Sequence, residues 1–430
     1  NSISGNNITN NHDGIWLYSS SCNSISGNNI TNNAYGIELY YQSNNNSVNG
    51  NNMTNNGYGI WLYYQSNNNS VSGNNITENN YHGILLSSSG NNISGNTFTN
   101  NGLLVWGSFR NSVENNTVNG RPLVYLEGVS NYTVDDAGQV ILVRCENIRV
   151  EGLNLSRTYI GVELWETNNS TISGNNITAN NGCGIYFWDS SNNSIAGNNI
   201  TNNTYGIWML ESSNNNSISE NNITNNGKGI DGGSSNSTIY GNNITNNGDG
   251  IRLGSSSSNS ISGNNIAANN WDGIKLGSSS SNSIFGNNIT NNYDGINLAY
   301  SSSNSISENN ITHNHDGIFL RESSNNVIYH NNLISNSRQV YDISWVNEWY
   351  FPSINTWDDG YPSGGNYWSD YMGIDADGDG IGDTPYVIDA DNQDRYPLMH
   401  PWSPLPVHNV NTGLGYATIQ EAINANETLN

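Results

Sequence analysis

The sequence predicts an all-β fold: a right-handed parallel β-helix (solenoid) of coils of about 22 residues, with an aromatic, calcium-loop C-terminal cap. Three observations predict it. A unit of the form Asn-Ser-Ile-Ser-Gly-Asn-Asn-Ile-Thr-Asn-Asn-x-x-Gly-Ile-x-Leu recurs along the chain. The apolar residues of its Ile-x-Leu segment alternate with a period of two, which is typical of a strand. Asn, Gly and Ser fill the turns between these short apolar segments, and Asn and Gly tolerate the left-handed backbone that tight turns need.

The repeat predicts that each coil stacks its apolar residues on those of the next coil. The first column has steps of 22, 23, 23 and 22 residues, at Ile8, Ile30, Met53, Ile76 and Phe98. Stacked strands lie about 4.8 Å apart, and a stack buries the apolar side that one coil leaves open. A leucine-rich repeat has a similar length, but its L-x-x-L-x-L signature is missing. After an interruption the column resumes at Ile177, Ile200, Ile223, Ile244, Ile266, Ile289, Ile311 and Leu333.

Four segments are expected. Residues 1–339 form the β-helix repeats, with longer, irregular coils over about 119–160, where strand-like alternation persists without the repeat. Residues 340–400 are rich in Trp and Tyr and are predicted to cap the open end of the solenoid, with an Asp-rich calcium-type loop. Residues 401–412 contain three prolines and form a linker. Residues 413–430 contain a short amphipathic pattern and are expected to begin a second β-helix domain as its N-terminal cap.

The composition limits the partners. The chain has 11 Lys and Arg residues against 35 Asp and Glu, a formal charge of −24, which disfavours nucleic acid and anionic lipid as partners. The three cysteines (Cys22, Cys145 and Cys183) are odd in number and far apart, so they imply no disulfide framework. No apolar run approaches the roughly 18 residues of a membrane span. The chain opens inside a repeat, so we interpret it as a segment of a longer polypeptide, in which a missing signal peptide carries little weight.

Three motifs follow the repeats in order: Gly365-Asn-Tyr-Trp-Ser-Asp370, Asp377-Gly-Asp-Gly-Ile-Gly-Asp-Thr-Pro-Tyr386 and Asp394-Arg-Tyr-Pro-Leu398. With the tandem units they resemble the NosD-like family, right-handed β-helix proteins of the carbohydrate-binding and sugar-hydrolase repeat type that are common in archaeal cell-surface proteins. The resemblance covers nearly all of the chain. The family takes its name from a periplasmic accessory protein for copper-site maturation, and the fold resemblance by itself carries function poorly.

The strongest chemical signal is an acidic loop. Asp375, Asp377, Asp379 and Asp383 stand at positions 1, 3, 5 and 9, with the carbonyl of Ile381 at position 7, as in the first part of an EF-hand-like calcium loop. Position 12 is Tyr386 and not a bidentate Glu, so Asp389, Asp391 or Asp394 would have to complete the shell. So many neighbouring carboxylates repel one another without a cation. We therefore expect structural Ca²⁺ here, against the alternative of a solvated acidic loop.

A column of aspartates precedes the glycine of four coils, at Asp249, Asp272, Asp294 and Asp316. Stacking places these carboxylates roughly 5 Å apart. Asp-Gly is a favourable turn, and turn formation is the preferred interpretation. Cation binding and paired acids for glycoside chemistry stay open.

The position between Ile and Leu in Gly-Ile-x-Leu is expected to face outward, and aromatic residues fill much of it. An exposed aromatic stripe suits sugar stacking or a protein interface, whereas shielding of the sheet face is the structural alternative. The expected glycan- or partner-binding residues are Trp16, Tyr18, Tyr40, Trp61, Tyr63, Tyr186, Trp188 and Trp208.

Copper and glycosylation are two further expectations. His313, His315 and His330 form the one histidine group that could supply imidazoles to copper, while the methionines and cysteines are scattered. Asn-x-Thr/Ser sequons recur with the repeat, so stacking of Asn corners explains their number, and we expect some glycosylation if the chain is exported. These sequons lie at Asn7, Asn29, Asn52, Asn75, Asn176, Asn199, Asn222, Asn243, Asn288 and Asn310.

Together these features favour a non-enzymatic, extracellular structural or adhesive cell-surface protein. The expected protein is a calcium-capped rod in a surface layer, sheath or filament that associates with itself or with neighbouring surface proteins, and polysaccharide binding stays open. The first alternative is a polysaccharide lyase or glycoside hydrolase, and the second is a copper-site accessory protein that requires His313 or His315. For the enzyme, the residues to examine are those of the irregular coils, namely Asp135, Asp136, Arg144, Glu146 and Arg149.

Overall fold

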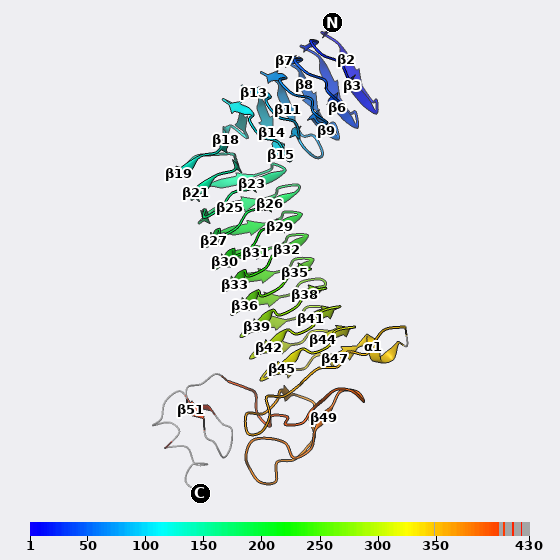
Figure 1. Cartoon of the computed structure of the whole chain (residues 1–430), viewed down its shortest axis with the longest axis vertical. Helices are drawn as coiled ribbons and strands as arrows, with labels where there is room; N and C mark the ends of the chain where they lie inside the picture. The colour runs from blue at the N-terminus through cyan, green and yellow to red at the C-terminus, as the bar shows by residue number, and fades with distance from the viewer. Residues whose placement is uncertain (348, 404–406, 409–414, 417–422, 424–430) are drawn as a thin grey trace. The chain divides into compact units, whose positions relative to one another are not determined.

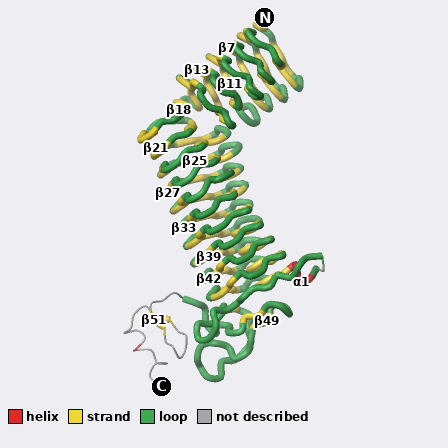
Figure 2. Tube along the Cα trace, viewed as in Figure 1, coloured by secondary structure: helices red, strands yellow, loops and turns green. Residues whose placement is uncertain are grey.

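A computed structural model describes residues 1–347, 349–403, 407–408, 415–416 and 423. The chain divides into two compact units. Unit 1 holds Asn1–Asn216 and Asn221–Gly227, and unit 2 holds Ser217–Glu220 and Lys228–Asn430. In both units successive coils pair in parallel, one strand per coil in each sheet (Figures 1 and 2), so the predicted right-handed parallel β-helix is confirmed.

The first coils of unit 1 build three parallel sheets. The first contains β1 (Ser2–Ser4), β4 (Ser24–Ser26), β7 (Ser47–Asn49), β10 (Ser70–Ser72), β13 (Asn92–Ser94) and β16 (Ser112–Glu114). The second contains β2 (Asn7–Thr9), β5 (Asn29–Thr31), β8 (Asn52–Thr54), β11 (Asn75–Thr77), β14 (Thr97–Thr99) and β17 (Thr117–Val118). The third contains β3 (Asp13–Tyr18), β6 (Tyr35–Tyr40), β9 (Tyr58–Leu62), β12 (Ile84–Leu86) and β15 (Leu103–Val105).

The register follows the repeat. Ile8 lies opposite Ile30, Ile30 opposite Met53, and Ile76 opposite Phe98, as the predicted column requires. These side chains are buried from Ile30 onward, because each coil covers the apolar side of its neighbour.

The irregular coils follow in the same unit. β18 runs antiparallel to β17 and then parallel to β20, so the predicted irregularity begins with a reversal of direction at residues 119–120. The remaining strands of unit 1 are β18 (Arg121–Glu127), β19 (Ser130–Val134), β20 (Gln139–Val143), β21 (Glu146–Glu151), β22 (Asn154–Ser156), β23 (Ile160–Trp165), β24 (Thr171–Ser173), β25 (Asn176–Thr178), β26 (Cys183–Trp188), β27 (Ser194–Ala196), β28 (Asn199–Thr201), β29 (Tyr205–Leu210) and β31 (Asn222–Thr224).

Buried asparagines hold the corners in both units. In one ladder of unit 1, the backbone N–H and the Nδ2 of Asn28 both donate to Oδ1 of Asn51, at 3.0 and 2.9 Å. Asn51 donates in the same way to Asn74. Because polar groups in a dry core need partners, the ladder explains how a chain with so little apolar surface builds a stable interior.

Unit 2 repeats this architecture. Its regular strands are β30 (Ser217–Ser219), β32 (Lys228–Gly232), β33 (Thr238–Tyr240), β34 (Asn243–Thr245), β35 (Asp249–Gly254), β36 (Ser260–Ser262), β37 (Asn265–Ala267), β38 (Asp272–Gly277), β39 (Ser283–Phe285), β40 (Asn288–Thr290), β41 (Asp294–Ala299), β42 (Ser305–Ser307), β43 (Asn310–Thr312), β44 (Asp316–Arg321), β45 (Val327–Tyr329), β46 (Asn332–Ile334) and β47 (Arg338–Asp342).

The segment after residue 340 continues the last coils of unit 2. Trp357 and Trp368 are fully buried, and their indole N–H groups donate to Asn392 and Asp394 at 3.1 and 2.8 Å. Asp394 also accepts the backbone N–H of Asn366, so a carboxylate ends an asparagine ladder. The elements here are α1 (Ile343–Val346), β48 (Tyr367–Trp368), β49 (Tyr386–Val387), β50 (Gln393–Asp394), β51 (Val407–His408) and β52 (Gly415–Tyr416).

The predicted domain boundaries stay predictions. Most of the expected linker at 401–412 and of the expected second cap at 413–430 lies outside the described residues.

Candidate functional site

The first coils of unit 1 carry a continuous layer of aromatic rings, here called the aromatic surface. Trp16 and Tyr18 are about half exposed. The ring of Tyr40 lies 5.6 Å from Tyr18 and 4.5 Å from Tyr63, and Tyr63 stacks on Trp61 at 4.1 Å. Parallel coils put these rings close together, because Tyr18 of β3 lies opposite Tyr40 of β6, and Tyr63 directly follows β9 on the next coil. The surface consists of Trp16, Tyr18, Tyr35, Tyr40, Tyr41, Tyr58, Trp61, Tyr63, Tyr64 and Tyr81.

The expected stripe is not uniform. Glu38, between the aromatic residues at this position, is buried, and burial followed by the charge of Asp13 raises its pKa to about 7. Tyr186 is only 1% exposed, which corrects the expectation that it faces solvent. Trp188 stacks on Trp165 at 4.9 Å, and Trp208 stacks on Tyr205 at 4.7 Å.

The ladder of the third sheet stops at β15, which pairs with β12 but with no strand of the irregular coils. We call this junction between β15 and the β20–β23 sheet the seam. Two side chains replace the missing strand partner. Gln139 accepts the N–H of Leu103 at 3.0 Å and donates to the Leu103 carbonyl at 2.7 Å. Glu163 Oε2 accepts the N–H of Val105 at 3.3 Å.

Glu163 is the most unusual ionisable group at the seam. Its side chain is fully buried, and Oε1 has no hydrogen-bond partner among the described residues. Burial raises the pKa of this carboxyl well above its ordinary value, and the bond from Val105 offsets only part of that rise. Burial thus favours the protonated form of Glu163, since an isolated buried carboxylate is strongly disfavoured.

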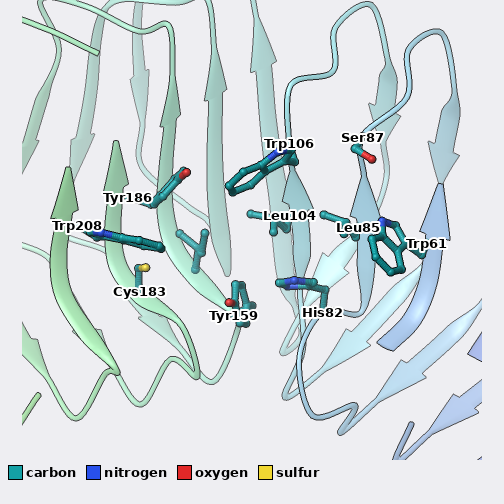
Figure 3. Close-up of a pocket in the computed structure, with 11 residues that line it drawn as sticks. Trp61, His82, Leu85, Ser87, Leu104, Trp106, Tyr159, Cys183, Tyr186 and Trp208 are labelled. Atoms are coloured by element: carbon teal, nitrogen blue, oxygen red, sulfur yellow. The ribbon is translucent and has the colours of Figure 1, made fainter. Parts of the chain in front are cut away.

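A pocket of about 310 Å³ opens beside the seam (Figure 3). Trp208, Tyr186 and Tyr159 approach it from the second half of the unit, and Trp61, Leu85 and His82 approach it from the first half, with Leu104 and Trp106 between them. Its volume is at the lower end of the roughly 300–1,000 Å³ typical of small-molecule sites. The lining residues are Trp61, His82, Leu85, Ser87, Leu104, Trp106, Tyr159, Ile160, Cys183, Tyr186 and Trp208.

Several polar atoms in the pocket wall have no partner. Nε1 of Trp61, Nδ1 of His82 and the hydroxyl of Tyr186 are buried without a hydrogen bond among the described residues. Burial lowers the pKa of His82 to about 3, so its imidazole is neutral, and burial raises the pKa of Tyr186. No described lining residue is a lysine, arginine, aspartate or glutamate. The pocket thus combines ring faces with a few neutral donors and acceptors.

The charged residues proposed for an enzyme in the irregular coils do not converge. Arg144 pairs with Glu166 at 2.8 Å, and Arg149 pairs with Glu151 at 2.6 Å. Asp136 pairs with Arg121 at 3.4 Å, with both side chains largely exposed. These are surface ion pairs, which contribute little to stability. The expected location of an active site among these residues finds no support in their geometry.

In unit 2, the aspartate column is in register. Asp272 lies opposite Asp294, and Asp294 opposite Asp316, and all three are nearly fully buried. Lys275 pairs with Asp272 at 2.7 Å, and Arg338 pairs with Asp316 through two bonds. Burial, followed by the charge of Asp272, raises the pKa of Asp294 to about 8. Two ion-paired carboxylates thus flank one that holds its proton at neutral pH.

The acidic loop brings together three of its predicted ligands. One carboxylate oxygen from each of Asp375, Asp377 and Asp379 lies within 4.8 Å of the others. Asp375 is fixed by the N–H groups of Gly378 and Gly380, at 2.7 and 2.9 Å. Burial acts to raise the pKa of Asp375, but these N–H bonds outweigh it and the pKa is lowered.

The other two predicted ligands are placed differently. Asp383 accepts the N–H of Ala376 at 2.9 Å and lies outside the group of three. Ile381 is buried, and its own N–H donates to Asp379 at 2.8 Å.

A copper site does not fit the described residues. His313 and His315 are exposed; His315 stacks on Tyr293 at 4.7 Å, whereas His330 is buried and stacks on Trp402 at 3.7 Å. Met53 and Met209 are in the apolar core. Among the described residues, the acidic loop is the one group of three His, Cys, Asp or Glu side chains close enough to share a metal. Histidine and cysteine side chains, which copper favours, therefore form no such group among the described residues.

The sequon asparagines form outer ladders on the strands. Asn29 donates through Nδ2 to Asn7 at 2.9 Å, and Asn52 donates to Asn29 at 2.8 Å. The same nitrogen would carry an N-linked glycan, so modification of every member would break the ladder. Stacking therefore accounts for the recurrence of the sequons, and their modification stays a prediction.

Three residues at the seam were missed by sequence reasoning: Gln139, Glu163 and His82. Glu163 did leave a signal, because it occupies the outward position of Gly161-Val162-Glu163-Leu164, opposite the apolar Ile141 and the aromatic Tyr186. A lone acid among apolar and aromatic neighbours marks a special environment. His82 stands before the glycine of its coil, where the two preceding coils have Tyr35 and Tyr58, and Gln139 stands where the repeat has glycine; neither position signals a role at the seam.

The family model described as periplasmic copper-binding protein (NosD) matches residues 1–124, 122–270 and 232–373. No curated protein matches the chain. Among solved structures, the periplasmic alginate epimerase AlgG is 19% identical, over 71% of this chain and 74% of that chain, with a TM-score of 0.44. The Azotobacter vinelandii mannuronan C-5 epimerase AlgE4 A-module is 14% identical, over 75% and 88%, at 0.42. The tailspike protein of E. coli bacteriophage HK620, a mutant in complex with a pentasaccharide, is 10% identical, over 77% and 71%, at 0.37.

Across the described residues, no helix has both the length and the apolar character that crossing a membrane requires.

Proposed function

This chain belongs to the NosD family, and from that premise we propose that it is an exported, non-enzymatic adhesive protein that binds a polysaccharide through its aromatic surface. The aromatic surface of unit 1 is the observation that carries the proposal. Its rings are held on stacked strands, so they form a firm platform that loses little side-chain entropy when a ligand binds. Self-association and contacts with neighbouring surface proteins stay predictions.

A sugar chain fits this surface chemically. The C–H faces of pyranose rings are apolar and pack on aromatic faces, while their hydroxyls stay in water or bond to tyrosine hydroxyls. Trp16 and Tyr18 project from one strand of one coil, and Tyr40 and Tyr63 follow on the next two, so consecutive sugar units can contact consecutive coils. A ligand the size of a single sugar would leave most of these rings exposed, so the surface favours an extended polymer as its ligand.

The test is a variant in which Trp16 and Tyr40 are both replaced by alanine. Each lost stacking contact removes about 0.5–1.5 kcal/mol, so polysaccharide binding should weaken about tenfold. Affinity electrophoresis in gels containing different polysaccharides measures this. The control is Trp271→Ala, an exposed tryptophan of unit 2 outside the aromatic surface, which should bind as the unchanged protein does. Equal binding by the double variant would contradict the proposal, as would a lack of binding to every polysaccharide.

A structural Ca²⁺ in the acidic loop is the second part of the proposal. Asp375, Asp377 and Asp379 supply hard oxygen ligands. Hydrogen bonds from backbone N–H groups to Asp375 hold the loop in the conformation that brings these carboxylates together. Burial and then the charge of Asp379 raise the pKa of Asp377, which indicates repulsion that a cation would relieve. The remaining ligands would come from carbonyls, other carboxylates of this segment or water.

Adding Ca²⁺ to chelator-treated protein is expected to raise the melting temperature of the segment after residue 340. Binding to the folded state alone stabilises by about 2.7 kcal/mol when the free ion is at 100 times its Kd. Differential scanning calorimetry with Ca²⁺ and with Mg²⁺ measures the shift, and the variant Asp377→Asn/Asp379→Asn should lose it. Glu308→Gln, an exposed carboxylate elsewhere in unit 2, is the control. A shift that survives in the double variant would place the ion elsewhere.

A further inference from the structure

The seam pocket contains features that packing alone does not explain. A well-packed interior leaves few voids and few unpaired polar atoms, because each unpaired buried group is unfavourable by about 1–3 kcal/mol. Here a pocket of about 310 Å³ coincides with unpaired polar atoms of Trp61, His82 and Tyr186. Two of those side chains, His82 and Tyr186, are more than nine-tenths buried. Such a combination is typical of a site that a ligand completes.

The pocket is continuous with the aromatic surface. Trp61 belongs to both: its indole lines the pocket and stacks on Tyr63 at 4.1 Å, and the ring of Tyr58 lies 5.6 Å away. A polymer lying on the rings of β3, β6 and β9 therefore reaches the pocket at the end of that layer. On the far side, Tyr186 and Trp208 continue the ring contacts at 5.5 Å.

The lining selects the ligand's charge and shape. Flat walls of indole and phenol suit a ring, and the unpaired donors and acceptors suit hydroxyls rather than a hydrocarbon. No described cationic side chain lines the pocket to neutralise a carboxylate. The chain's net charge of −24 would repel an anionic ring at longer range.

We propose that the seam pocket is a subsite that takes one neutral sugar ring of the bound polysaccharide, held between Trp61, Trp106 and Trp208 and hydrogen-bonded by Tyr186 and His82. The inference rests on the proposed polysaccharide-binding function and adds its selectivity: neutral hexose units are accepted and uronate units are rejected. The aromatic surface contacts several units of the polysaccharide, and the pocket binds one unit selectively.

Two variants test the pocket. Tyr186→Phe removes only an unpaired hydroxyl, so the fold should stay intact, and binding of a neutral glycan should weaken about threefold to tenfold. Leu104→Trp places a large ring among the lining side chains and should abolish measurable binding of the sugar unit that enters the pocket. Trp271→Phe in unit 2 is the matched control and should bind as the unchanged protein does.

The probes are hexamers of glucose, mannose and galactose, with an oligouronate of the same length, titrated by isothermal calorimetry. Binding of a neutral hexamer that falls in both pocket variants, with no binding of the oligouronate, supports the inference. Preference for the oligouronate overturns it, as does a pocket that takes free indole without competition from any sugar. If the pocket variants bind normally while Trp16→Ala/Tyr40→Ala binds weakly, the pocket is excluded and the aromatic surface stands. If no hexamer or polysaccharide binds, the proposed function itself fails.

Discussion

Replacing Gly250 with alanine is expected to destabilise unit 2 by about 3 kcal/mol, near the upper end of what overpacking produces. Gly250 is the second residue of β35, and a Cβ there would lie 2.5 Å from the carbonyl oxygen of Gly273 on the next coil. Its other near neighbours are Ile266 and Asn269, at 3.0 and 3.1 Å. The strand has no direction in which to move, because the stacked coil and the core both oppose it.

The matched control lies in the same strand. Gly254 is the last residue of β35, and a Cβ there would meet nothing within 4 Å. Gly254→Ala should therefore leave stability unchanged or raise it slightly, since alanine restricts the unfolded chain. Urea unfolding, with hydrogen exchange of peptides covering 243–277, compares the two. Similar losses for both would show that flexibility of the strand, rather than the close approach of coils, requires these glycines.

Asn51→Leu is expected to be at least as damaging, by about 3–5 kcal/mol. Asn51 is buried, and its Oδ1 accepts the backbone N–H and the Nδ2 of Asn28, while its own Nδ2 donates to the carbonyl of Ile25 at 3.0 Å. Leucine has a similar volume and no polar atom. The substitution therefore removes these bonds from the backbone N–H of Asn28 and from the Ile25 carbonyl in a dry interior, each loss unfavourable by about 1–3 kcal/mol, while Nδ2 of Asn28 keeps its bond to the carbonyl of Ile3.

The neighbouring residue provides the control for Asn51. Asn52 points to the outer face, and its Nδ2 donates to Asn29 at 2.8 Å, in contact with solvent. Asn52→Ala should lose less than about 1 kcal/mol, because water replaces the bond. Hydrogen exchange of residues 24–79 locates the loss, since coils of a solenoid can open locally. Equal protection in the two variants would refute a special role for the inner ladder.

The repeat predicted much of the fold because it is local and recurring. The spacing of Ile8, Ile30 and Met53 is the register that the sheets adopt, and Tyr18, Tyr40 and Tyr63 do lie beside one another on adjacent coils. A period of about 22 residues leaves one way to stack such similar coils. Asparagine at recurring corners likewise predicts the ladders, since identical polar groups in register can bond to one another.

The candidate pocket could not be predicted in the same way. It exists because β15 lacks a strand partner on the side away from β12, where Gln139 and Glu163, 36 and 58 residues along the chain, bond to its backbone instead. Their positions depend on the path of the irregular coils, which no period specifies. The burial of Tyr186 has the same origin, because the seam covers an outward position that is exposed at Trp16 and Arg252 in other coils.

By itself, then, the sequence determined the β-helix, its register, its asparagine ladders and the aromatic residues at its surface. Each of these follows from residue type at a fixed interval, which stacking converts directly into contact. Only the tertiary structure decided which outward residues are exposed, where the sheet is interrupted and which buried polar atoms lack partners. Those properties depend on atoms brought together from distant coils, and burial, rather than spacing, sets their chemistry.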